Sequence, residues 1–336
     1  MPNTTGHQSQ KDSSGSRSPG RVLRLLSEYP LPPSWDWNED RWESIQTSKF
    51  SLSEVAHCDL VAVDGDVNIL SRLVAAGFLS RKWHKPIIAV DVVLRPPKNM
   101  WQRRLFPALF KRIPYFIHYF RDLSGYEKYY GIGTDRSAFV EFKANLRYRH
   151  EPNSEAGEYV LCFGGSMRDY DTFLAALDGA AIPGAISEIT AKQLSEAKIP
   201  QNIRVLPDDN TQESLIRIIE GARVVALPIR PDNICASGLS TYLNSMLLGK
   251  AVILTEGPGV SDILNDQALI IEPQNPASLR KAIERLWSDD KLRCAFAEQG
   301  RKYAESLGGD PEFCARLRDA MMDWYYGAHR SSRNST

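Results

Sequence analysis

Short apolar runs alternate with amphipathic segments along most of this chain, and the alternation predicts an α/β fold. The runs are typical of strands that are buried on both faces of a parallel sheet. In the first half, the predicted strands are 22–26, 59–63, 86–93 and 115–119, and the predicted helices are 68–76, 97–111 and 124–130.

The second half continues the same alternation. Its predicted strands are 159–163, 185–189, 203–206, 224–227, 251–255 and 268–271, and its predicted helices are 170–177, 212–220, 239–248, 275–287, 291–307 and 311–326. Asn210, followed by Glu213, predicts the start of one helix, and Pro276 at a first helical position predicts another.

Polar stretches divide the chain into domains. The first twenty residues are rich in Ser, Gly, Lys and Gln and are expected to be disordered. The polar stretch HEPNSEAG, residues 150–157, predicts a linker between two doubly wound, Rossmann-like domains at 21–150 and 151–308. Ligands of such domains bind at the carboxyl ends of the strands, so we expect a central cleft where the two domains face each other.

One segment of the second domain, 222–256, predicts a ligand site. It reads as strand, loop, helix and strand, and the helix follows Gly238. Ser237, Ser240, Thr241 and Asn244 share one face of that helix at helical spacing. A helix N-terminus favours an anion such as a phosphate. An ordinary packed helix with a solvated polar face is the alternative.

The composition of the chain argues against several classes of function. Lys plus Arg and Asp plus Glu are 41 each, so no overall charge attracts the chain to nucleic acid. Five cysteines are scattered without metal-binding spacing, which favours reduced thiols in a cytoplasmic protein. We find no signal peptide and no apolar run long enough to cross a membrane, and no metal or cofactor is expected.

The order of features in the second half resembles GT-B glycosyltransferases, specifically the large family four of retaining enzymes. The similar segments are CFGGSMRDYDTFLAAL, ARVVALPIRP, SGLSTYLNSMLLGKAVILTEGPGVSDIL and the ending ALIIEPQNPASLRKAIERLWSDDKLRCAFAEQGRKYAES. In the first half, GYEKYYGIGTDRSAFVEF resembles the run before the linker. The resemblance implies two Rossmann-like domains, a helix at 309–328 that crosses back to the first domain, and a nucleoside-diphosphate sugar as donor substrate.

The resemblance also implies roles for individual residues. By the resemblance, Arg168 neutralises the donor diphosphate and Asn244 faces the ribose. Arg230, in the loop after the strand 224–227, is a candidate second cation. The residues implied to approach the donor phosphates are Gly164, Gly165, Ser166, Ser237, Gly238, Leu239 and Ser240.

Two departures from that family qualify these roles. The family usually has two glutamates, of which the first contacts the donor sugar and the second the ribose; this chain has Ala236 and Asn244 there. Asp232 is a candidate replacement for the first glutamate. The family's glycine-rich loop after the first strand is also missing, because residues 27–42 contain no glycine.

The first domain offers acceptor-side candidates. Trp35 and Trp37 could form an aromatic wall for a sugar or lipid acceptor, or belong to a loop packed on the domain. Asp91 lies at the end of a predicted strand and is the candidate catalytic residue that orients an acceptor hydroxyl, or it caps the next turn. His118 is expected to be a core histidine with its hydrogen bonds satisfied.

Two further motifs in this domain each have two interpretations. Asp64-Gly65-Asp66 has the pattern of a metal site, but a turn followed by a helix-capping Asp66 accounts for it. The segment MWQRRLFPALFKRI, from Met100 to Ile113, interleaves basic and apolar residues. It predicts either a peripheral contact with the inner face of the plasma membrane or an ordinary surface helix.

The sequence therefore predicts a GT-B glycosyltransferase that transfers a hexose-type sugar to an acceptor hydroxyl without a metal, the acceptor being a glycan, a glycolipid or a lipid-linked precursor of polysaccharide biosynthesis. A non-catalytic GT-B module that binds a nucleotide or a partner protein is one alternative. A sugar-nucleotide epimerase is the other.

Overall fold

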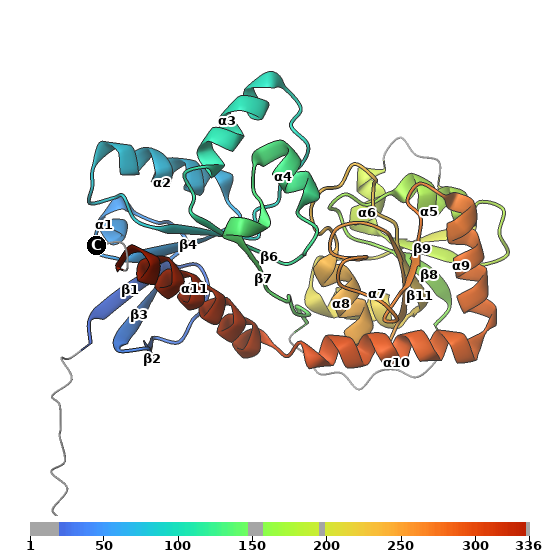
Figure 1. Cartoon of the computed structure of the whole chain (residues 1–336). Coiled ribbons are helices and arrows are strands. Elements are labelled where there is room, and N and C mark those ends of the chain that lie inside the picture. Colours follow the sequence, from blue (N-terminus) through green and yellow to red (C-terminus); the bar gives the residue numbers. More distant parts are fainter. Residues whose placement is uncertain (1–19, 147–156, 195–198, 334–336) are drawn as a thin grey trace, which may run out of the picture.

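The computed structural model describes residues 20–146, 157–194 and 199–333. The predicted tail and nearly all of the predicted linker lie outside these ranges. Two α/β domains lie side by side, and helices α10 and α11 run along one side of both (Figure 1). Among the described residues, no helix is both long and apolar enough to cross a membrane.

The N-terminal domain is built on a seven-stranded sheet with the order β2-β3-β1-β4-β5-β6-β7. Its described strand pairings are parallel except that β2 runs antiparallel to β3. The strands are β1 Val22–Ser27, β2 Ser34–Trp37, β3 Asp40–Gln46, β4 Leu60–Asp64, β5 Ile87–Val90, β6 Tyr115–His118 and β7 Ser137–Phe139. The helices are α1 Leu52–Ala56, α2 Val67–Leu79, α3 Met100–Phe110, α4 Ser124–Tyr130 and a 3-10 turn at Thr134–Arg136.

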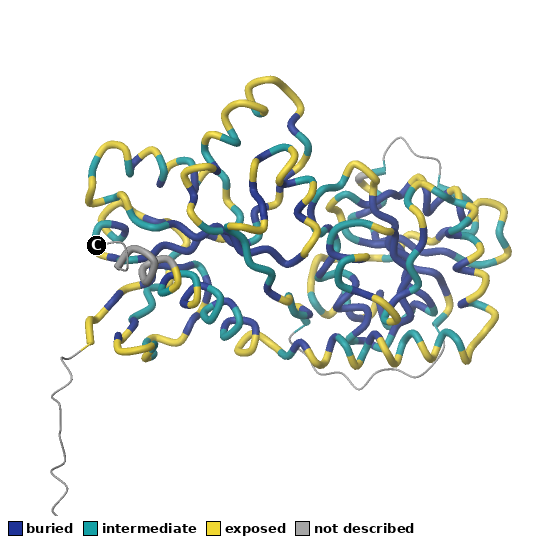
Figure 2. Tube along the Cα trace, viewed as in Figure 1, coloured by how far each residue is buried: buried dark blue, intermediate teal, exposed yellow. Residues whose placement is uncertain are grey.

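Alternate residues of these strands face two different layers. Val61 and Val63 pack with α2, α3 and α4 on one face. Leu60, Ala62 and their neighbours pack with α11 on the other. This arrangement explains why the strands read as continuous apolar runs, and Figure 2 shows them buried.

The C-terminal domain has a six-stranded parallel sheet with the order β10-β9-β8-β11-β12-β13. The strands are β8 Tyr159–Cys162, β9 Gly184–Ser187, β10 Ile203–Leu206, β11 Ala222–Leu227, β12 Ala251–Thr255 and β13 Leu269–Ile271. The helices are α5 Tyr170–Leu177, α6 Glu188–Gln193, α7 Gln212–Glu220, α8 Leu239–Leu247, α9 Pro276–Ser288, α10 Asp290–Ser306 and α11 Asp310–Arg333. The strand order reverses between β8 and β11, and ligands of such sheets bind at this point.

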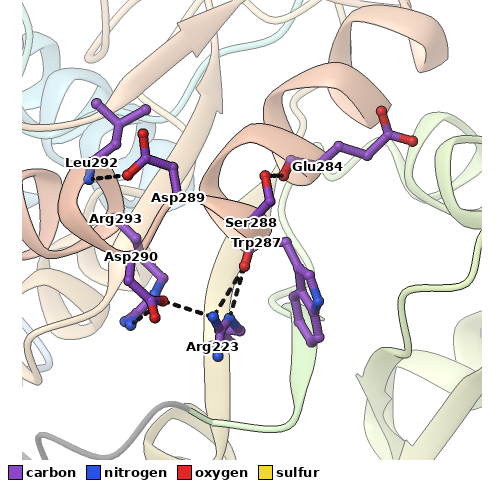
Figure 3. A network of polar contacts seen from close by, with 8 residues as sticks. All are labelled: Arg223, Glu284, Trp287, Ser288, Asp289, Asp290, Leu292 and Arg293. Carbon is purple, nitrogen blue, oxygen red and sulfur yellow. Dashed lines mark hydrogen bonds and ion pairs between the residues drawn. The ribbon is translucent and has the colours of Figure 1, made fainter.

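The start of the crossing arm α10–α11 is fixed to this sheet by a polar network (Figure 3). Arg223 of β11 donates to the Trp287 carbonyl at 3.0 Å, pairs with Asp290 at 2.7 Å and stacks over the Trp287 ring. Arg293 also bonds Asp290, and the Asp289 side chain caps α10. The arm therefore leaves the C-terminal domain from a defined point.

At its far end the arm packs against the N-terminal domain. Trp42 of β3 is fully buried, with its ring 5.0 Å from that of Tyr325, and its indole N–H donates to the Tyr326 hydroxyl at 3.0 Å. The Tyr326 hydroxyl in turn donates to Asp40 at 2.9 Å. The predicted crossing helix is thus present and extends to Arg333, further than 309–328.

Several short elements are not predicted from the sequence. The residues expected to form a loop after β1 instead contain the β2–β3 hairpin, and β7, α1 and α6 were not predicted. The predicted strand 185–189 ends at Ser187, because its side chain caps α6. Helix α7 is capped by Thr211, not by Asn210, which has a positive φ of 62°. Asn275 with Pro276 does start α9, and Asp66 does cap α2.

Candidate functional site

Arg168 lies where the loops after β8 and β11 meet, at the point where the strand order reverses. The two loops pair through backbone bonds: Asp169 N–H donates to the Pro228 carbonyl and Arg230 N–H to the Met167 carbonyl, both at 2.9 Å. Arg168 itself forms an antiparallel bridge with Ile229, and its Nε donates to the Phe163 carbonyl at 3.0 Å. The guanidinium is therefore held by both loops.

Two glycines make room for that guanidinium. A Cβ at Gly164 would lie 3.0 Å from Arg168 Nη2, and a Cβ at Gly238 would lie 3.1 Å from the same atom. Both glycines have positive φ angles, 94° and 86°, which side chains rarely adopt. The turn after β8 and the N-terminus of α8, predicted separately as phosphate-binding elements, thus meet around one cation.

The charge of Arg168 has no counter-ion among the described residues. The side chain is only 7% exposed, and its Nη1 has no hydrogen-bond partner among them. Burial lowers its pKa, because a charged group loses hydration there. Helix α8 begins at Gly238 without a side-chain cap in the described structure, so its first amides also lack acceptors. An anion would satisfy both groups.

A pocket of about 360 Å³ opens beside this cluster. Its lining residues are Gly165, Arg168, Asp169, Tyr170, Asp171, Leu194, Arg230 and Gln274. Gly165 lines this pocket and is exposed, and Ser166, the next residue in the chain, is exposed as well. Arg230 pairs with Asp232 at 3.3 Å, and both side chains are more than half exposed. Asp232, the candidate replacement for a missing glutamate, therefore already partners a cation.

The polar residues predicted to share one face of α8 have different surroundings in the structure. Ser237 is buried and donates to the Asn233 side chain at 2.9 Å, so it supports the loop. Leu239 is buried in the core, while Ser240 is half-buried and Thr241 lies against Gly164. Only the first turn of α8 is thus placed beside Arg168.

Asn244 holds the connection between the two domains. Its Oδ1 accepts the Asn145 N–H at 2.7 Å, and Gln212 donates to the Asn145 carbonyl at 3.2 Å. Asn244 is 5% exposed. Its predicted contact with a ribose stays a prediction, for which the amide nitrogen and the second lone pair of the oxygen are available.

In the N-terminal domain, Asp91 follows β5 at the carboxyl edge of the sheet. It has a positive φ of 48°, and its N–H donates to the Ile117 carbonyl at 2.8 Å. Burial, reinforced by the charge of Asp64, raises the pKa of Asp91 to about 7. Its carboxyl group is therefore balanced between its two protonation states near neutral pH.

A tyrosine network that the sequence did not reveal lies next to Asp91. Tyr29 donates to Asp64 Oδ1 at 2.8 Å, and its hydroxyl lies 3.1 Å from that of Tyr119. The Asp64 N–H donates to Glu28 at 2.7 Å. Tyr29 and Tyr119 follow β1 and β6, and Asp64 ends β4, so the topology brings them together although the chain separates them.

The two domains meet at these loops. Ile234 lies against Gly125, where an added Cβ would come within 2.6 Å of its side chain. Next to it, Cys235 is buried, and the charges of Asp91 and Arg95 both act on its thiol pKa, which burial raises. The loop that leads to Gly238 therefore reaches the neighbourhood of Asp91, whereas the pocket beside Arg168 is lined by residues of the C-terminal domain.

A second contact between the domains was also missed. Asp262 Oδ2 accepts the backbone N–H groups of Arg121 and Asp122 at 2.6 and 2.9 Å. Its Oδ1 accepts the Gly259 N–H at 2.6 Å. Asp262 belongs to the segment on which the family resemblance rests, but nothing in the sequence indicates its partners.

Two expectations for the first domain need correction. Trp35 and Trp37 lie in β2 rather than in a loop; Trp35 stacks on Trp42 and Arg318 of α11 lies over Trp37, so the packing alternative describes them better. Their role toward an acceptor stays a prediction. His118 is buried as expected, but neither ring nitrogen has a hydrogen-bond partner in the described structure.

Comparisons with known proteins agree with this architecture. Residues 186–303 match the family model described as glycosyl transferases group 1. A search of curated protein sequences finds no match. HepE of Anabaena, solved with UDP and glucose, superposes with a TM-score of 0.64 at 11% identity over 90% of this chain and 99% of its own.

Two other solved structures are similar over most of this chain. Sucrose-phosphate synthase of Thermosynechococcus elongatus gives a TM-score of 0.63 at 12% identity, covering 91% of this chain and 89% of its own. The O-GlcNAc transferase of Thermobaculum terrenum gives 0.63 at 13% identity, covering 94% and 70%.

The fold is therefore GT-B, and the resemblance to GT-B glycosyltransferases expected from the sequence is confirmed, whereas membership of the retaining family four stays a prediction. The glycosyl transferases group 1 match falls on the C-terminal domain, where the Arg168 site lies, and supports the predicted enzyme class, a glycosyltransferase.

Proposed function

We propose that the protein transfers a sugar from a nucleoside diphosphate to an acceptor hydroxyl, with the diphosphate bound at Arg168. The observation that carries the proposal is the buried guanidinium without a counter-ion beside the open N-terminus of α8. A diphosphate supplies both the charge and the acceptors that these groups lack. HepE, which shares the fold, was solved with UDP and with UDP-glucose, so uridine nucleotides are the first ligands to test.

In the proposed reaction, the bond between the anomeric carbon and the diphosphate oxygen breaks, and its electron pair stays on the diphosphate. Arg168, Arg230 and the amides at Gly238, Leu239 and Ser240 stabilise that developing charge without a metal. One such preorganised donor typically contributes about 3 kcal/mol to a rate.

On the acceptor side, ionised Asp91 accepts a hydrogen bond from the acceptor hydroxyl and orients its oxygen toward the anomeric carbon. That oxygen forms the new bond to the anomeric carbon, and its proton passes to the departing diphosphate oxygen. Retention of the anomeric configuration and membership of family four belong to the proposal through the resemblance of the C-terminal segments. The acceptor is a glycan, a glycolipid or a lipid-linked precursor. A lipid-linked acceptor would place this cytoplasmic enzyme at the inner face of the plasma membrane, in contact through Met100 to Ile113.

Titration with uridine, guanosine and adenosine diphosphates tests the first step, with Arg168→Ala as the control. We expect one nucleotide to bind and the variant to bind it at least about a hundredfold more weakly, because a bidentate, charge-assisted contact is lost. An acceptor screen with the matching sugar nucleotide then tests transfer. No binding of any nucleotide would contradict the proposal.

One observation favours a second candidate, a non-catalytic module that binds a nucleotide or a partner protein. Ala236 and Asn244 stand where the related enzymes have glutamates, and the Asn244 oxygen holds the interdomain segment instead. Nucleotide binding without hydrolysis or transfer in the screen would favour the module. Interconversion of the free donor would instead identify an epimerase.

A further inference from the structure

A second cavity, of about 410 Å³, opens in the N-terminal domain between the β2–β3 hairpin and the end of α11. Its lining residues are Asp36, Trp37, Asn38, Asp323, Tyr326 and Gly327. The first three lead into the hairpin turn, and the last three recur at i, i+3 and i+4, so they share one face of the helix. The volume is in the range of small-molecule sites, and the proposed reaction does not involve this cavity. We call it the hairpin–α11 pocket.

The hairpin–α11 pocket lies away from Arg168 and from Asp91. Trp37 pairs with Asp40 where the hairpin turns, and Asp40 begins β3, which runs parallel to β1. The turn is therefore at the amino edge of the sheet, whereas Asp91 follows β5 at the carboxyl edge. Figure 1 shows the hairpin and the end of α11 on the side of the N-terminal domain that is turned away from the C-terminal domain.

Two aromatic rings of this pocket are held in place by contacts behind them. The Tyr326 hydroxyl is engaged with Asp40 and Trp42, which fixes the position of its ring. Trp37 is partly buried and packs against the hydrophobic core. A Cβ at Gly327 would meet no atom within 4 Å, so the absence of a side chain leaves this wall open. Flat rings that are fixed beforehand suit a sugar, because its apolar C–H face stacks on them.

The polar side chains of the pocket present hydrogen-bonding groups to solvent. Asp36 and Asp323 are exposed, and so is Asn38, which has a positive φ of 54°. Within the described structure none of these three side chains makes a hydrogen bond, and Asp36 pairs with Arg41 at 3.7 Å. Carboxylates accept hydrogen bonds from hydroxyl groups, and an amide both accepts and donates. The described lining includes no cation, so a phosphate or carboxylate ligand is disfavoured.

A cationic ligand is also disfavoured, because arginines of this chain already occupy the positions that would attract it. Arg41 pairs with Asp36, and the Arg318 guanidinium lies over Trp37, 6.0 Å from the ring centre. A cationic ligand would have to compete with both side chains. A neutral ligand with several hydroxyl groups would use the rings and the hydrogen-bonding groups together.

We propose that the hairpin–α11 pocket binds a neutral glycan, with one sugar ring against Trp37 and hydroxyl groups bonded to the carboxylates of Asp36 and Asp323. Together with the proposed function, on which this step rests, the pocket assigns a polymeric glycan as the acceptor. Strand β1 has six residues and is about 20 Å long, so the two edges of the sheet are about that far apart. A glycan that reaches both the pocket and Asp91 is therefore a chain of several sugars.

Calorimetric titration of the full-length protein with maltohexaose, cellohexaose and chitohexaose tests the pocket. We expect at least one of them to bind. Gly327→Leu fills the cavity from a helical position and should weaken binding at least about tenfold without destabilising the helix. Asn38→Gly with Asp323→Ala removes hydrogen bonds to the ligand and should also weaken it about tenfold. Trp37→Ala should weaken binding, and Trp37→Phe, which keeps a ring, should retain most of it.

A matched control comes from the other domain. Asn210 also has a positive φ, of 62°, and Glu284 is exposed on α9, so Asn210→Gly with Glu284→Ala makes equivalent changes outside the pocket. It should leave oligosaccharide binding unchanged. No binding by the wild type, or equal binding by Gly327→Leu, would overturn the proposal. Binding of tetramethylammonium that Gly327→Leu abolishes, without oligosaccharide binding, would assign the pocket to cations instead.

These outcomes are separable from glycosyl transfer. The titration contains no nucleotide, so its failure leaves the uridine diphosphate titration untouched, and the reverse also holds. If an oligosaccharide binds, transfer to the corresponding polysaccharide and to its disaccharide tests the assignment of the acceptor. We expect Gly327→Leu to raise KM for the polysaccharide at least about tenfold, with kcat and the KM for the disaccharide unchanged. Equal effects on the two acceptors would refute the assignment.

Discussion

Replacing Arg168 with methionine should stabilise the ligand-free protein and weaken nucleotide binding about a thousandfold. Methionine has a similar length and fits the space between Gly164 and Gly238 without introducing a charge. The wild-type guanidinium is 7% exposed and lacks a partner for Nη1 in the described structure. Stability and function are therefore expected to change in opposite directions at this one position.

The magnitudes follow from the contacts of Arg168. Burying a charge without a counter-ion costs several kcal/mol, and we take this cost as about 4 kcal/mol for Arg168. The variant also loses the bond from Nε to the Phe163 carbonyl and the contact with the Tyr170 hydroxyl, together a loss of about 2 kcal/mol. The net gain of about 2 kcal/mol should raise the unfolding midpoint by about 4–8 °C. Two charge-assisted bonds to a diphosphate contribute about 3–5 kcal/mol, so affinity should fall roughly a thousandfold.

Thermal unfolding with and without uridine diphosphate, together with calorimetric titration, measures both effects. The matched control is Arg230→Met, because Arg230 lies in the partner loop but is exposed and paired with Asp232. It should leave the midpoint of the ligand-free protein unchanged and weaken binding about tenfold or less. A ligand-free Arg168→Met protein that unfolds at a lower temperature than wild type would refute the reasoning, as would unchanged affinity.

Three further predictions concern the domain connection and two buried groups. Asn244→Ala leaves the Asn145 N–H without its acceptor and should lower the stability by about 1–2 kcal/mol in denaturant unfolding; an unchanged midpoint would show that the bond is dispensable. Burial lowers the pKa of His118 to about 4, so the native state resists protonation of this residue. As the pH falls from 6.5 toward 4, wild type should therefore lose stability relative to His118→Phe by about 1.4 kcal/mol per pH unit. Parallel curves of stability against pH for the two proteins would contradict this prediction. Because the pKa of Asp91 is raised to about 7, the rate of glycosyl transfer should increase as the pH rises through 7. The Asp91→Asn variant should have a lower rate that does not change with pH in this range. The same pH dependence in the variant would assign the titration to another group.

Much of the fold could be predicted because its parallel strands are covered on both faces. A strand such as Val224 to Leu227 is apolar on both faces and is therefore easy to recognise in the sequence, and Gly249 marks the end of the helix that follows Gly238. The β2–β3 hairpin was missed since its prolines and tryptophans read as a loop, and its packing depends on α11, almost three hundred residues later. The three residues of β7 are too few to form a pattern.

Residues of the candidate site could be predicted where they lie close to one another in the sequence. Gly164 and Arg168 are four residues apart, so the motif itself indicates a cation beside a turn. Asn244 was assigned to a ribose from its position alone, whereas its bond to Asn145 spans 99 residues and can be found only in three dimensions. The same holds for Asp262, whose partners lie 140 and 141 residues away.

The packing of α11 on the N-terminal sheet has a consequence for synthesis on the ribosome. Leu60 and Ile117 share one core with Leu317 and Met321, so that face of the first domain stays uncovered until the last helix has been translated. The N-terminal domain therefore cannot complete its fold as the chain emerges, although the C-terminal sheet is finished earlier. A nascent chain should therefore expose this apolar surface until α11 has left the exit tunnel.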